Sequence, residues 1–259
     1  MAVTAELHTR RLERPSWFHA LGAMTRWDLT DLRMVLPIVI VVQILAGVGF
    51  VLGISLFFDH IPEPVALYVS TGVVVLNLTL VGLIMGPQLT ADQKLAGTYE
   101  YLRVLPVPAT AAAVAWFTVA LVASVPAAVV SLIVAELRYG ISFTVTPSIV
   151  PAVLLTAFTG TMLGYALSHA VSNPMSTRMI AQLLVFFVFG FSPILYPASQ
   201  QPDWLARISG WLPFEHMATI VRAGLTTGMV DDVGRSYAVV AIWGLIGTAL
   251  AARALVRRA

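Results

Sequence analysis

The side chains that most often do chemistry in proteins are sparse and scattered in this sequence of 259 residues. There is no cysteine, and the five histidines are too dispersed for metal-ligand spacing. Neither the phosphate-loop pattern GxxxxGK[ST] nor the nucleophile pattern GxSxG is present. The neighbours Ser168 and His169 could suggest a hydrolase, but a hydrogen-bonded histidine at a helix end is the better explanation. The sequence therefore predicts no enzyme active site and no cofactor bound by this chain.

The charged residues are few and clustered, and their clustering predicts the fold class. Only 11% of the residues are charged, whereas a soluble domain has about 25%. A helix needs about 20 apolar residues to cross a bilayer core of roughly 30 Å. Six stretches without Asp, Glu, Lys or Arg are long enough, the last one barely: Met34–Phe58, Pro64–Ala91, Val104–Ala135, Tyr139–Thr177, Met179–Pro202 and Ser236–Ala252. They predict an all-α membrane protein with six transmembrane helices.

The predicted spans contain no Asp or Glu. Carriers coupled to protons or sodium ions use ionisable groups inside the membrane. The sequence thus argues against such a carrier, and the energy for any transport must come from another subunit.

Six spans place both ends of the chain on one side of the membrane. Eleven of the 15 lysine and arginine residues fall on that side, and the other four are Arg138, Arg207, Arg222 and Arg235. Basic loops stay in the cytoplasm, so both termini are predicted to be cytoplasmic and the chain to lie in the cell membrane. The basic isoelectric point then follows from membrane topology, and no nucleic-acid partner is expected.

The chain divides into an N-terminal arm, residues 1–33, and a six-span transmembrane domain, residues 34–259. Within the arm, apolar residues recur at steps of three and four from Trp17 to Leu32, after a helix-opening Pro15-Ser16. This pattern predicts an amphipathic helix in the cytoplasmic membrane interface, with a solvated arm as the alternative. Within the spans, three glycine pairs at a spacing of four predict close helix packing: Gly49 and Gly53, Gly82 and Gly86, Gly160 and Gly164.

Polar groups inside the spans are Gln43, Asn77, Thr79, Gln88 and Gln182. Because such groups are costly in lipid, they face other protein or water. Asn77 sits in the middle of its span and is a candidate for the translocation path, as are the aromatic residues Phe186, Phe187, Phe189 and Phe191. Ordinary packing between helices is the alternative for each of them.

The connection after the second span predicts a short cytoplasmic helix at about residues 92–105. Gly97 permits a turn, Thr98 can cap the helix by accepting a backbone N–H, and Glu100 lies in its first turn, where negative charge is favourable. Pro106 and Pro108 end the element before the third span.

The connection after the fifth span is too apolar for a solvated loop and too interrupted by proline for a span. It predicts external re-entrant helices at about residues 197–226, because irregular backbone at membrane depth must lie against protein or water. Glu215 and His216 in this element are either gating residues or simply exposed. The candidate residues of this element are Trp204, Trp211, Pro213, Glu215 and Arg222.

Both connections resemble segments of type-2 ABC exporter permeases. Residues 94–107 read KLAGTYEYLRVLPV, similar to the family pattern (E/K)xxGTxExLxxxP. Residues 192–205 read SPILYPASQQPDWL, similar to SPxxYPxxxxPxWL, and Pro213 and Arg222 follow at the family's spacing. Leu212 stands where the family usually has asparagine. The two matches lie in the expected order among six spans, so the resemblance extends over most of the chain.

The resemblance implies a permease subunit of an ATP-driven exporter. Its coupling helix would dock on a separate ABC-type ATPase subunit, present in two copies, which holds ATP and magnesium. A second permease copy or a related permease would complete the translocation path, flanked by spans two and five. The cargo would be an amphiphilic compound such as a drug or antibiotic, or alternatively a lipid-linked polysaccharide or lipid. A secondary carrier or channel, or a membrane-embedded enzyme, are the rival classes. The residues implied in ATPase coupling are Asp92, Lys94, Gly97, Thr98, Glu100 and Arg103.

Overall fold

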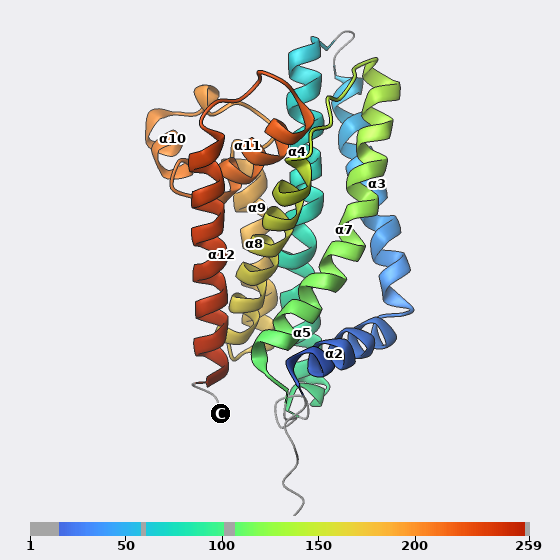
Figure 1. The fold of residues 1–259 in the computed structure, drawn as a ribbon, viewed down its shortest axis with the longest axis vertical. Coiled ribbons are helices and arrows are strands. Elements are labelled where there is room, and N and C mark those ends of the chain that lie inside the picture. Colours follow the sequence, from blue (N-terminus) through green and yellow to red (C-terminus); the bar gives the residue numbers. More distant parts are fainter. Residues whose placement is uncertain (1–15, 58–60, 101–106, 257–259) are drawn as a thin grey trace, which may run out of the picture.

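The computed structural model describes residues 16–57, 61–100 and 107–256, which form helices and no strand (Figure 1). Six helices are long and apolar enough to cross a membrane, which confirms the predicted fold class. They are Val35–Leu56 (α3), Glu63–Leu95 (α4, η1 and α5), Ala109–Tyr139 (α7), Ile149–Ala170 (α8), Pro174–Phe191 (α9) and Val233–Ala254 within α12 (Val233–Val256).

Successive spans run in opposite directions along the bundle (Figure 1). The helix α2 (Trp17–Asp31) and the end of α12 therefore lie at the same end, which we call the α2 end. The short helix α10 (Asp203–Ser209) lies at the opposite end, which we call the α10 end.

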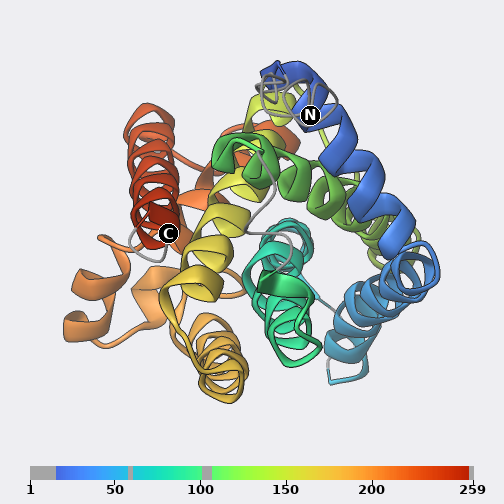
Figure 2. The same cartoon turned by 90° about the horizontal axis from the view of Figure 1, so that it is seen from below.

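The second span is the central helix of the bundle. Its apolar window is 78% buried, whereas that of α3 or α9 is only 17% buried. It consists of α4 (Glu63–Leu80), a π-helical turn η1 (Val81–Met85) and α5 (Gly86–Leu95). The π-helical turn lies just before Pro87, which has no N–H to donate to the carbonyl of the preceding turn. Viewed along the bundle, α4 and α5 lie between α3 and α9 (Figure 2).

Glycines allow the second span to approach α8 closely. A Cβ atom on Gly164 would lie 2.1 Å from the carbonyl oxygen of Gly82, and a Cβ atom on Gly82 would lie 2.5 Å from Cα of Thr161. Gly86 and Gly160 also have close neighbours, whereas the predicted pair Gly49 and Gly53 on α3 has none within 4 Å. The predicted close packing is thus confirmed within this chain for two of the three glycine pairs.

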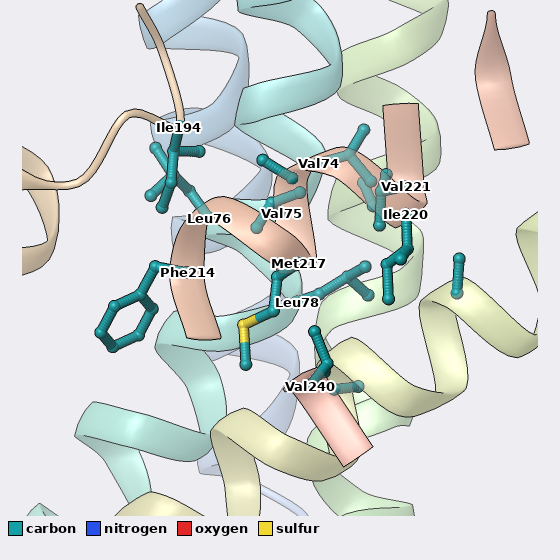
Figure 3. Close-up of a cluster of buried hydrophobic side chains, with 14 of the residues drawn as sticks. Val74, Val75, Leu76, Leu78, Ile194, Phe214, Met217, Ile220, Val221 and Val240 are labelled. Atoms are coloured by element: carbon teal, nitrogen blue, oxygen red, sulfur yellow. The ribbon is translucent and has the colours of Figure 1, made fainter. Parts of the chain in front are cut away.

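The main apolar core lies where the helix α11 (Pro213–Leu225) packs against α4, α8 and α12 (Figure 3). Met217 and Ile220 of α11 and Leu78 of α4 are fully buried in it, together with Val240 of α12. Because α11 is 13 residues long, it contributes to this core without crossing the bundle.

The helix α2 begins as the sequence predicts. Ser16 caps it by accepting a hydrogen bond from the His19 N–H at 3.4 Å. Figure 1 shows α2 lying crosswise at its end of the bundle, and the Trp17 indole donates to Thr110 Oγ1 of α7 at 3.0 Å. Phe18 and Trp27 remain 79% and 49% exposed, as an interfacial helix requires.

The connection from α9 to α12 is broken into short helices at the α10 end. It contains η2 (Ala198–Gln200), α10 and α11, with Pro197, Pro202 and Pro213 at or just before their first residues. The segment after α7 is tied to it, because the N–H groups of Thr144 and Thr146 donate to carbonyls at the end of α11, both at 2.9 Å.

Candidate functional site

The connection after α5 is a turn exposed at the α2 end. α5 ends at Leu95, and Gly97 has φ +77°, a conformation that glycine adopts without strain. Helical backbone resumes at Thr98. Gly97, Thr98 and Glu100 are exposed, as a docking surface requires.

The structure corrects the helix predicted for residues 92–105. Asp92 and Lys94 belong to the last turn of α5, so Gly97 divides the predicted helix into two parts. Thr98 Oγ1 donates to the carbonyl of Gln93 at 3.2 Å, a bond that reaches back to α5. The turn that Thr98 is predicted to cap continues into residues outside the described ranges. Arg103 lies outside the described residues.

Asp92 and Lys94 join the end of α5 to the connection between α8 and α9. Lys94 Nζ donates to the carbonyls of Ser168 and Val171 at 2.6 and 2.8 Å. Asp92 accepts a hydrogen bond from Arg178 in the first turns of α9 and forms an ion pair with it. We call these five residues the α5–α9 clasp.

The two halves of the clasp differ in strength. The carbonyls at a helix C-terminus have no partner within their own helix, and a cation there is favoured by the helix dipole. Hydrogen bonds to a charged group contribute about 1.5–3 kcal/mol each, whereas an exposed ion pair contributes about 0–1 kcal/mol. The Asp92 and Arg178 side chains are 56% and 39% exposed, so Lys94 is the stronger half.

Sequence reasoning missed Arg178 and the two carbonyls as partners of the coupling connection. In the sequence, Arg178 counts only as one of the basic residues that indicate the cytoplasmic side. Its position in a short loop on the same predicted side as Asp92 could have indicated an ion pair between them. His169 beside the clasp is buried and hydrogen-bonded to the Tyr165 carbonyl at 2.8 Å, as expected for a helix-end histidine.

The helix α9 has one face directed away from the bundle. Asn173 caps its start, accepting from the N–H groups of Met175 and Ser176. The predicted path residues Phe186, Phe187 and Phe191 are exposed, but Phe189 is directed inward and stacks on Phe50 of α3 at 5.3 Å between ring centroids. Gln182 is exposed on α9 and makes no hydrogen bond within the described residues.

Asn77 has the contacts of a packing residue. It is 4% exposed, and its Nδ2 donates to Ser131 Oγ of α7 at 3.1 Å. A Cβ atom on Gly47 of α3 would lie 2.8 Å from the same nitrogen. Asn77 therefore lies where three helices of the chain meet. This is ordinary packing between helices, which the sequence analysis gave as the alternative to a place in the translocation path.

Arg222 is buried in the core at the α10 end, only 2% exposed. Its Nε donates to Thr71 Oγ1 at 3.1 Å, and its Nη2 donates to the carbonyls of Tyr68 and Ile194 at 3.3 and 3.1 Å. Its guanidinium carbon lies 3.5 Å from the centre of the Tyr68 ring. Arg222 thus fastens α11 and the segment after α9 to α4.

The other predicted residues of the α10 end are more dispersed. Trp204 and Trp211 are 57% and 81% exposed, and Pro213 opens α11. His216 is buried between Ser236 Oγ and the Gly210 carbonyl, which argues against simple exposure of this residue. One oxygen of Glu215 is buried without a partner among the described residues, and burial raises the pKa of its carboxyl.

Six helices that can span a membrane, a broken element at one end and an exposed connection fastened to a neighbouring span at the other are the features of a multi-pass membrane protein. A family model described as ABC-2 family transporter protein matches residues 62–253. The chain therefore belongs to this family, the membrane subunits of ABC transporters, which normally work with an ABC ATPase subunit. No curated protein matches the chain.

Proposed function

We propose that the chain is the permease subunit of an exporter that moves an amphiphilic compound, such as a drug or antibiotic, out of the cell. A separate ATPase subunit, which carries ATP and magnesium, docks on the connection after α5. Two ATPase copies act on two permeases, either identical or related. The α2 end faces the cytoplasm, because basic loops are retained there.

The observation that carries this proposal is the α5–α9 clasp. The docking connection begins where α5 ends, and Lys94 and Asp92 in that last turn bind the start of α9 and the end of α8. A displacement of the connection by the ATPase subunit is therefore transmitted to α9. α4, unlike α9, is packed in the main apolar core, and it cannot follow the displacement of the connection without disrupting that core.

The exposed face of α9 supports a path along this helix. Phe186 and Phe187 suit an apolar or amphiphilic cargo. An amide such as that of Gln182 is costly in hydrocarbon, so its exposure favours protein or water over lipid at this face. The apolar face of α3 is also exposed, at Val42 and Leu45, and a second copy can cover both helices.

Two other cargoes or mechanisms make different predictions. A lipid-linked polysaccharide or a lipid would use the same aromatic face but would be moved only as the lipid-linked form. A secondary carrier or channel would move cargo without an ATPase subunit.

The test uses the full chain co-purified with its ATPase subunit and reconstituted in liposomes. Lys94→Met should leave ATPase binding intact and lower ATP-driven transport at least tenfold, because it removes two hydrogen-bond donors of the clasp. Glu100→Gln should weaken ATPase binding itself. Arg253→Met is the matched control, since it removes a positive charge from the end of α12, outside the clasp. Transport by the permease alone, or normal transport by Lys94→Met, would contradict the proposal.

A further inference from the structure

A cavity of about 820 Å³ lies between α2 and the ends of α5, α7 and α8. Four carboxylate residues line it: Asp28, Asp31, Asp92 and Glu100. No lysine or arginine occurs among the described lining residues. The described lining is therefore rich in carboxylates, and of these only Asp92 belongs to the clasp.

The acidic side of the cavity belongs mainly to α2. Asp28 and Asp31 are three residues apart and so share a face of this helix, with Met24 and Leu32 on the same face. The Asp28 side chain is partly buried, and its carboxylate makes neither a hydrogen bond nor an ion pair within the described residues, whereas the Asp92 carboxylate is paired with Arg178. Arg26 of α2 and Arg33, which follows the helix, line a separate groove.

Another part of the cavity lining is apolar. Val35, Leu89 and Trp116 line it. Trp116 is seven residues after the start of α7, which is about 10 Å along a helix. The buried indole N–H of Trp116 has no hydrogen-bond partner within the described residues and lies against Gly86, where a Cβ atom would come within 2.9 Å.

We infer that this cavity binds a cationic amphiphile with an aromatic or apolar body. The positive charge lies between Asp28 and Asp31, and the body lies against Leu89 and the Trp116 ring. This inference rests on the proposed function, since it names the class of cargo that the exporter receives at its cytoplasmic end.

The charge of the ligand follows from the lining. A cation is attracted to a partly desolvated carboxylate and to the face of a tryptophan ring. An anion of the same shape would be repelled by Asp28 and Asp31, and a neutral compound would leave the Asp28 carboxylate without a partner. The apolar body is needed because the inner wall offers mainly apolar contacts.

The protonation of Asp28 supports the same reading. Burial, and to a lesser extent the neighbouring Asp31, raises the pKa of Asp28 to about 7. A permanent cation therefore competes with a proton, and its affinity should rise by up to about tenfold between pH 6 and pH 8, as the ionised fraction of Asp28 grows. The other titratable groups that line the cavity are Asp31 on α2, Asp92, Tyr99 and Glu100 on the α5 side, and Tyr165 and His169 on α8.

The test measures binding to the purified full chain, without any ATPase subunit. Tetraphenylphosphonium and tetraphenylborate are suitable probes, because they share one shape and carry opposite charges. We expect saturable binding of the cation only. Asp28→Asn should weaken it at least tenfold at pH 8 and reduce its pH dependence. Asp203→Asn at the α10 end is the matched control and should bind normally.

A second variant guards against misfolding of the first. Ala112→Phe fills part of the cavity without changing its charge and should also weaken binding, with the unfolding temperature measured for both variants. Equal affinity for the two ions, or normal binding by Asp28→Asn, would overturn the inference. Cation binding without ATP-driven transport would refute only the proposed function. If ATP-driven transport of amphiphiles did not depend on their charge and was unaffected by Asp28→Asn, only the role of the cavity as the cation-binding site would be refuted.

Discussion

The contact between Gly164 and Gly82 allows a direct test of how the second span is held. In Gly164→Ala the new Cβ atom would lie 2.1 Å from the Gly82 carbonyl oxygen, whereas ordinary contacts begin at 3.4 Å. The overlap is 1.3 Å (3.4 − 2.1), and the nearest atoms are backbone, which no rotamer change can move away. Overpacking of this kind costs about 1–3 kcal/mol, and we expect the upper end of that range. The unfolding temperature in detergent should fall by about 6–12 °C.

The matched control is Gly53→Ala on α3, where nothing lies within 4 Å. Alanine is favoured over glycine in a helix by about 1 kcal/mol, so this variant should unfold at the wild-type temperature or slightly above it. Both variants add one methyl group to a glycine of a spanning helix, and only the neighbours differ. A wild-type unfolding temperature for Gly164→Ala, or an equal loss in both variants, would refute the argument from close approach.

Three further predictions concern buried polar groups. Arg222→Met should destabilise the chain by about 2–4 kcal/mol in thermal unfolding, because two carbonyls and a hydroxyl lose their donor. Arg222→Lys should recover less than half of that lost stability, since lysine lacks the planar guanidinium group. Asn77→Leu should cost about 1–2 kcal/mol of stability and leave transport by the folded fraction unchanged; a loss of transport at normal stability would instead place Asn77 on the path. The pKa of Asp28 is about 7 in the folded chain, against an ordinary value of 3.8. Between these two pH values the folded state therefore binds more protons than the unfolded state, and the unfolding temperature should fall as the pH rises. Asp28→Asn should flatten that slope, and an unchanged slope would contradict the assigned burial.

The spans could be predicted from the sequence because they depend on local composition. A stretch of about 20 residues without charge can be recognised without knowledge of its neighbours. The turns could be predicted for the same reason: α8 ends and α9 begins around Asn173-Pro174, and α7 ends at Gly140 with φ +66°. Glycine and proline restrict the backbone directly.

Contacts between distant residues could not be predicted in the same way. Arg222 reads as one of four charges on the external side, but it lies in the core and binds residues about 150 positions earlier in the chain. Asn77 reads as a polar residue in mid-span, and only the approach of α7 shows that Ser131 accepts its hydrogen bond. The direction of each phenylalanine on α9 likewise depends on α3, which turns Phe189 inward while Phe186 stays exposed.

The distribution of contacts along the second span and α9 explains why the proposed path follows α9. α4 is part of the buried core with α8 and α11, and close packing resists small displacements. α9 buries only Thr177, Ala181 and Val188. It packs against α5, is bound to Asp92 through Arg178 at one end, and stacks Phe189 on Phe50 of α3 toward the other. The π-helical turn η1 separates α5 from α4, and such turns often occur at functional sites. A force on the docking connection therefore meets less resistance if α5 and α9 move together than if the whole second span moves. Under the proposed function, ATP hydrolysis on the partner subunit would therefore drive the chain through a joint movement of α5 and α9.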